Sequence, residues 1–239
     1  MKKNCLILFT CILFSISAFA QGFKLGLRFA PNIAMNSVED KLTDNVDFSN
    51  DGVAVRYSAG VIGDFFFAEN YAFSTGFWFT VKRSGVKANR TDTTIGGTHH
   101  VVSNLQYVQL PISLKMYTNE IADDIKMYFQ VGSTFGIKTG EKQTKFDPKV
   151  GATGNNVPEI KKPDNPNGYS SLELGLLLAA GAELRMGENT SLFGGISFNR
   201  ELVNSISKKG PFNYPEPGNM RNQMANINSL LSLEVGLKF

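Results

Sequence analysis

Apolar and polar residues alternate along most of this chain, which is the period of a β-strand with two unlike faces. The segment 231–239 shows it best, with Leu, Leu, Val, Leu and Phe at every second position and Ser, Glu, Gly and Lys between them. Residues 23–30 alternate in the same way. The same period recurs in six further segments: 53–67, 71–82, 107–116, 126–135, 172–183 and 191–199. The pattern therefore predicts eight strands.

The connections between these segments alternate in length. Long links alternate with short ones along the chain. The long links are 35–51, 84–99, 139–169 and about 203–225, and the short ones are 68–70, 118–123 and 187–189. Since antiparallel neighbours place successive links at opposite ends, all long loops share one end and all tight turns the other. Outer-membrane barrels have this asymmetry, with short periplasmic turns and long external loops. We expect an all-β fold, an eight-stranded antiparallel up-and-down transmembrane β-barrel, with both termini periplasmic.

The composition of the two faces predicts which of them meets lipid. One face is bulky Phe, Leu, Val and Ile, whereas the other is rich in Gly and Ser, which suits the narrow interior of an eight-stranded barrel. A soluble barrel with its apolar face around a ligand is the alternative. Seven charges are expected to pair inside: Lys24, Arg28, Arg56 and Lys115 with Glu173, Glu183 and Glu234. If the polar face met lipid instead, each Lys or Arg near the bilayer midplane would destabilise the barrel by about 2–4 kcal/mol. Arg200 alone lies on the apolar face, near a strand end where it can snorkel.

The first 20 residues have the features of a signal peptide. Lys2 and Lys3 precede an apolar run over 5–14, and residues 17–20 end in a small-residue cleavage pattern, so we expect cleavage between Ala20 and Gln21. The apolar run is shorter than the roughly 20 residues of a spanning helix. Both cysteines precede the expected cleavage point, so the expected mature domain, 21–239, has no thiol chemistry. It keeps 22 basic and 21 acidic residues, a net charge of +1 that gives no reason to expect nucleic-acid binding.

Three segments resemble the PorT-like outer-membrane β-barrel family of Bacteroidetes. Residues 21–28 read Gln-Gly-Phe-Lys-Leu-Gly-Leu-Arg, residues 107–115 contain a Tyr-x-x-Leu-Pro-Ile signature, and residues 232–239 end on an aromatic. The resemblance implies an outer-membrane barrel whose C-terminal strand is read by the barrel-insertion machinery. The founding member serves a secretion system for proteases, a role not carried over here. Pro111, in a central strand, is expected to cause a bulge or local distortion.

The candidate chemistry of the chain is sparse. His99 and His100 are the only histidines, with Ser103 and Asp92 near them, but no G-x-S-x-G motif occurs. Neighbouring strand residues point to opposite faces, so the two histidines are poorly placed to chelate one ion. Residues 47–52 partly match a Ca²⁺ loop, yet the twelfth position, which needs an acid, is Ser58, and a turn is the favoured interpretation. We assign no catalytic, metal or cofactor-binding residue.

The expected function follows from the loops rather than from a catalytic site. We expect a non-enzymatic barrel, structural or partner-binding through its long external loops, within a secretion or envelope assembly. The expected partners are outer-membrane lipid and lipopolysaccharide, the insertion machinery and an envelope protein. Six lysines in the third long loop could attract lipopolysaccharide: Lys138, Lys142, Lys145, Lys149, Lys161 and Lys162. Two alternatives stay open, a lipid-modifying or proteolytic barrel enzyme using His99 or His100, and a narrow channel.

Overall fold

The computed structural model describes residues 22–40, 46–90, 97–150, 168–208 and 224–239. The expected signal peptide, 1–20, lies outside these ranges. In the described part no helix is long and apolar enough to cross a membrane. The described strands are β1 (Phe23–Asp40), β2 (Val46–Asn50), β3 (Ala54–Ala68), β4 (Tyr71–Arg90), β5 (Gly97–Ala122), β6 (Ile125–Val150), β7 (Leu172–Arg185), β8 (Ser191–Glu201) and β9 (Met224–Lys238).

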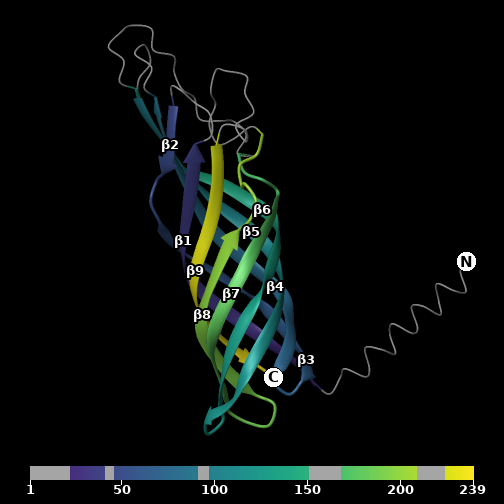
Figure 1. Ribbon diagram of the computed structural model, residues 1–239. Helices are drawn as coiled ribbons and strands as arrows, with labels where there is room; N and C mark the ends of the chain where they lie inside the picture. Colours follow the sequence, from purple (N-terminus) through teal and green to yellow (C-terminus); the bar gives the residue numbers. More distant parts are fainter. Residues whose placement is uncertain (1–21, 41–45, 91–96, 151–167, 209–223) are drawn as a thin grey trace, which may run out of the picture.

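Eight of the strands close into a ring (Figure 1). Around the ring the order is β1, β3, β4, β5, β6, β7, β8 and β9, all neighbours are antiparallel, and β9 returns to β1. β2 pairs only with the far end of β4 and continues the line of β3. The predicted fold, an eight-stranded antiparallel up-and-down barrel, is confirmed.

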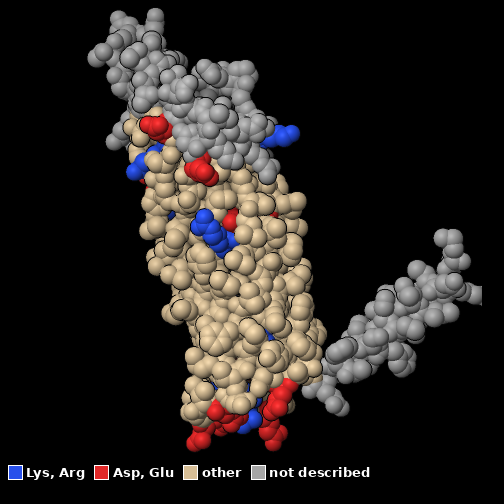
Figure 2. All heavy atoms as spheres, viewed as in Figure 1, with Lys and Arg blue, Asp and Glu red and all other residues tan. Residues whose placement is uncertain are grey.

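The two faces of the strands are divided as the alternation predicts. Outward side chains such as Leu27, Phe77 and Leu233 are 55%, 61% and 62% exposed, whereas inward Arg28 and Glu234 are buried. Figure 2 shows that the lower and central part of the viewed face is mostly uncharged and that charged residues gather toward the two ends. Such a wall, apolar outside and polar inside, is suited to lipid.

The strands are longer than the alternation predicts. β1 runs to Asp40, β4 to Arg90, β5 begins at Gly97 and β6 runs to Val150, so much of the three predicted loops 35–51, 84–99 and 139–169 is strand. β5 likewise continues to Ala122 through the predicted link 118–123. These loop boundaries were wrong because inter-strand hydrogen bonds continue beyond the lipid band, where neither face needs to be apolar. The short turns nevertheless share one end of the ring, and the strand ends that border the long connections lie at the other (Figure 1).

Irregular backbone was predicted at two places, Pro111 within a central strand and the segment 47–52 before the next strand. At Pro111 the structure shows the predicted local distortion and not a bulge, because the β4–β5 register is the same on both sides of it, Thr75 opposite Ile112 and Trp78 opposite Gln109. The ladder only has a gap there, and the Thr75 hydroxyl donates to the Pro111 carbonyl at 2.8 Å. The turn predicted at 47–52 was wrong for most of its length, because residues 47–50 belong to β2 and pair with β4; only 51–53 leave the strand, where Gly52 has φ +83°.

Two buried apolar clusters lie inside the ring. The first occupies the long-loop end and includes Tyr107, Tyr169, Ile206 and Met224. The second lies nearer the short turns, and its members are Ile62, Ala72, Trp78, Tyr117, Tyr128, Leu177 and Phe193. Charged side chains occupy the rest of the interior, and they form the candidate site.

Candidate functional site in the lumen

The lower lumen, nearest the short turns, holds an ion cluster built from four strands. Lys238 on β9 places its Nζ 2.7 Å from Asp64 of β3 and 2.5 Å from Glu183 of β7. The Tyr117 hydroxyl lies 3.1 Å from both carboxylates. Lys115 on β5 is 3.5 Å from Asp64, and its ammonium lies 4.0 Å from the centre of a tyrosine ring, that of Tyr128. The cluster therefore ties together distant parts of the ring.

The middle of the lumen is crossed by an arginine. Arg28 on β1 donates to Glu234 of β9 from Nη2 at 2.5 Å and from Nε at 3.0 Å, and to the Ser58 hydroxyl at 2.9 Å. Its guanidinium carbon lies 3.9 Å from the ring centre of Trp78. The charge is thus satisfied by a carboxylate, a hydroxyl and an aromatic face.

The upper lumen repeats this arrangement with a lysine. The Lys82 ammonium on β4 is 2.7 Å from Glu173 and 3.0 Å from Glu201. The Gln109 amide also donates to Glu173, and the Asn228 amide donates to Glu201 at 2.9 Å. A buried charge without a partner is strongly destabilising, and here each one has a partner. The three clusters fill the ring with side chains.

The structure confirms part of the predicted charge pairing. Lys24 pairs with Glu183 at 3.3 Å and Arg28 with Glu234, as predicted. The prediction for Arg56 was wrong, since its guanidinium donates to the Asn104 side chain and to a backbone carbonyl. Residues 54–57 lie beyond the end of the β3–β4 pairing, so the Arg56 side chain reaches past β4 to Asn104 of β5.

Sequence reasoning missed two acids that the structure brings into these clusters. Asp64 and Glu201 follow the same alternation as Ser58 and Asn199, and that signal could have placed them inside. They supply the partners of Lys115 and Lys82.

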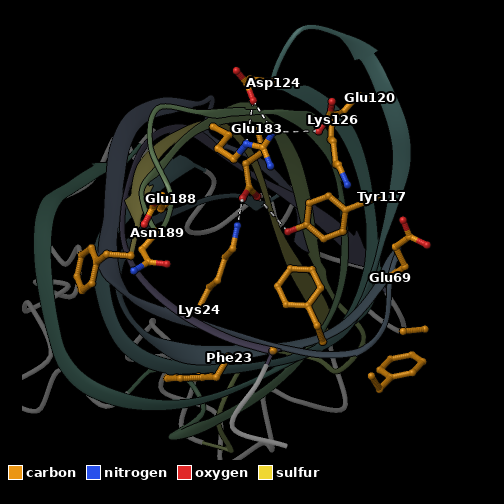
Figure 3. Close-up of a pocket in the computed structure, with 16 residues that line it drawn as sticks. Phe23, Lys24, Glu69, Tyr117, Glu120, Asp124, Lys126, Glu183, Glu188 and Asn189 are labelled. Carbon is orange, nitrogen blue, oxygen red and sulfur yellow. Dashed lines mark hydrogen bonds and ion pairs between the residues drawn. The ribbon is translucent and has the colours of Figure 1, made fainter.

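A cavity of about 980 Å³ opens below the lower cluster, at the short-turn end. Figure 3 shows Lys24 and Glu183 pointing toward each other inside it, with Tyr117 beside them. Acidic residues at the short-turn end of the ring line the cavity: Glu69, Glu120, Asp124 and Glu188. Arg185 is bonded to Asp124 at 2.6 Å, so part of this charge is neutralised.

The two histidines lie on different faces of β5, as predicted. His99 is buried, while the Nδ1 of His100 lies 3.1 Å from Asp51. Ser103 is buried on the face of His99, and Asp92 lies outside the described residues. No described serine hydroxyl bonds His100, so the described residues supply a His–Asp pair without a nucleophile. They also contain no group of three His, Cys, Asp or Glu side chains suited to a metal.

Family models and solved structures each include proteins that this chain resembles. Residues 19–207 match the family model described as outer membrane protein beta-barrel domain. Among solved structures, Neisserial surface protein A is 12% identical over 91% of this chain and 96% of that one, with a TM-score of 0.48. Ail of Yersinia pestis is 8% identical over 91% and 99%, with a TM-score of 0.38. Similarity this low does not extend those proteins' activities to this chain. No curated protein sequence matches it.

Proposed function

The chain belongs to the outer membrane protein beta-barrel domain family, and on that premise we propose that it is a non-enzymatic, non-conducting barrel that binds a partner at its long-loop end. The observation that carries this proposal is the filled lumen. Three buried ion clusters and an apolar cluster at the long-loop end occupy the interior. An eight-stranded ring is only wide enough for its own side chains.

The absence of conduction is tested in planar bilayers. Purified protein is expected to give no conductance steps, since a permeating ion would have to displace paired buried charges. The double variant Lys82→Ala/Glu173→Ala removes a buried ion pair and empties part of the upper lumen. It is the matched control that shows how conductance responds when the interior is less completely filled. Regular steps from the unmodified protein would contradict the proposal.

The orientation we propose places the long connections outside the cell and both termini in the periplasm. It is supported by the asymmetry of the turns, which outer-membrane barrels share. A cysteine placed at Lys142, on the long-loop side, is expected to react with a membrane-impermeant maleimide in intact cells. A cysteine at Lys126, beside the short turns, is expected to react only after the cells are broken. The reverse result would overturn the orientation.

We further propose that the chain is a PorT-like barrel of Bacteroidetes that works within an envelope or secretion assembly. The signature at 107–115 supports the subgroup, and the wall formed by β4, β5 and β6 beyond the lipid band offers a surface for an envelope protein. The strand ending at Phe239 would be the one read by the insertion machinery. A photo-crosslinker at Lys145 is expected to capture one defined protein in native envelopes, whereas one at Lys126 is not. Equal capture at both positions would argue against a specific partner site.

The pair of His100 and Asp51 favours one alternative, a hydrolytic barrel enzyme. Two of the three members of a catalytic triad are present there. Replacing both histidines by alanine is expected to leave lipid A profiles and peptide hydrolysis unchanged. A loss of either activity would replace our proposal with the enzymatic one.

A further inference from the structure

The outer wall is irregular between the end of β2 and the start of β3, two strands that pair with different parts of β4. β3 pairs with β4 as far as Ser58 opposite Thr80, and β2 takes over at Asn50 opposite Val86. The residues between, 51–57, are not paired with β4 except through the Asp51 amide, which donates to Gly85. Arg83 spans this gap and donates to the carbonyls of Asp51 and Gly52, the latter at 2.7 Å.

Four cations gather around this gap, and we call Arg56, Arg83, Lys87 and Lys142 the outer-wall basic cluster. Arg83 on β4, Asn104 on β5 and Lys142 on β6 are register neighbours, so they form one row across three strands. Arg56 is anchored onto this row, because its Nη2 donates to the Asn104 amide oxygen at 2.6 Å and its Nη1 to the Val55 carbonyl at 2.7 Å.

The cluster has an excess of positive charge. In the described part of the chain, Asp51 is the one carboxylate that pairs with any of the four cations, 3.6 Å from Lys87 and 4.0 Å from Arg83. Arg56 is held by neutral oxygens. A guanidinium held in place without a carboxylate retains its charge for an anion, and guanidinium and ammonium groups are the usual partners of phosphate.

The cluster also borders exposed apolar surface. Tyr57, which follows Arg56 on the side nearer the short turns, is 46% exposed. Further along β4 and β5, Phe79 and Val108 are paired neighbours on the lipid-facing side. Cations above an apolar wall match an amphiphile, whose head carries negative charge and whose chains are apolar.

We propose that the outer-wall basic cluster binds the phosphate groups of a lipid headgroup, with the acyl chains lying against Tyr57, Phe79 and Val108. The identity of the lipid rests on the orientation proposed above. With the long connections outside, the facing leaflet is the outer one, and the ligand is the phosphorylated lipid A part of lipopolysaccharide. Arg56 and Lys142 supply the charges, while Arg83 also keeps the segment 51–57 in place.

The test compares two double variants that remove the same charge at opposite ends. Arg56→Gln/Lys142→Gln alters the cluster, and Lys126→Gln/Arg185→Gln is its control at the short turns. Binding of diphosphorylated lipid A to each detergent-purified protein is measured by native mass spectrometry, after gel mobility has verified that the barrel is folded. Each basic group near a lipid surface contributes about a fivefold factor, so the cluster variant is expected to bind roughly 25-fold more weakly. The control variant is expected to bind like the unmodified protein.

Two further probes separate a lipid site from a general anion site. Dephosphorylated lipid A is expected to bind the unmodified protein as weakly as diphosphorylated lipid A binds the cluster variant. Inorganic phosphate is expected not to displace lipid A. Equal weakening in both double variants, unchanged binding after dephosphorylation, or displacement by inorganic phosphate would each overturn the proposal. Because binding in detergent does not depend on orientation, it can fail while the labelling of intact cells succeeds, and the two proposals are refuted separately.

Discussion

Replacing Asp64 by asparagine removes the acid that holds two lysines in the lower lumen. Its side chain is fully buried, and it accepts from Lys238 at 2.7 Å, from Ser74 at 2.6 Å and from Lys115 at 3.5 Å. After the change Lys238 keeps Glu183, whereas Lys115 loses its carboxylate and retains only aromatic faces. Breaking a buried pair in this way costs about 3–5 kcal/mol of unfolding free energy.

The measurement is denaturant unfolding in lipid vesicles, followed by the fluorescence of Trp78. This is the single tryptophan of the chain, and it lies in the lumen against Arg28. Asp124→Asn provides a matched control, since it makes the same chemical change at the exposed pair with Arg185 and is expected to cost less than about 1 kcal/mol. Adding Lys115→Met to Asp64→Asn is expected to recover much of the loss, because the unpaired buried charge is gone.

The outcome distinguishes a filled lumen from a wet one. If Asp64→Asn costs no more than Asp124→Asn, water screens the interior as it screens the surface. The lumen would then be an aqueous path, and the reasoning behind a non-conducting barrel would be refuted.

Three further outcomes are expected of the same protein. Val131→Arg puts a cation on the lipid face between two apolar neighbours and is expected to lower the unfolding free energy in vesicles by about 2–4 kcal/mol; a neutral effect would mean that this face does not meet lipid. Gly60→Val would bring a Cβ to 2.0 Å from the carbonyl oxygen of Phe77, so folded barrel is expected to be absent from the outer membrane, while Gly187→Val, at a turn with nothing within 4 Å, is expected to assemble normally. Raising the salt concentration is expected to leave the unfolding midpoint unchanged, since buried pairs are poorly screened, and a marked fall would show that the lumenal pairs are hydrated.

Alternation could predict the fold because lipid imposes it. Where a strand crosses the bilayer, one face must be apolar and the other polar, as at Leu231–Phe239, and all eight ring strands were found there. Beyond the bilayer that requirement ends, and the upper parts of β5 and β6 carry polar groups on both faces. Their strand character is fixed by hydrogen bonds to neighbours, which a one-dimensional pattern does not contain.

The sequence could predict which residues of the candidate site lie on the inner face, but not which of them are in contact. The alternation placed Lys82, Lys238 and Glu183 on the inner face, but the tilt and stagger of the strands decide which charges meet. Asp64 was not predicted to lie in the lumen, because Ile62 and Phe66 are on the same inward face and make both faces of that part of β3 apolar in the sequence. The basic cluster on the outer wall depends on the break between β2 and β3. The contact between Arg56 and Asn104 cannot be predicted from their positions in the sequence.

The ion cluster at Lys238 also has a consequence for assembly. The ring closes when β9 pairs with β1, a contact between the two ends of the described chain and therefore a late, slow step in folding. Alternation penalises a slip of one residue, which would turn every side chain over, but it tolerates a slip of two. Such a slip would carry the Lys238 ammonium about 7 Å away from Asp64, and would move Glu234 as far from Arg28. Two buried ion pairs would then be broken, so Lys238 and Glu234 select the closing register from among those that the hydrophobic pattern allows.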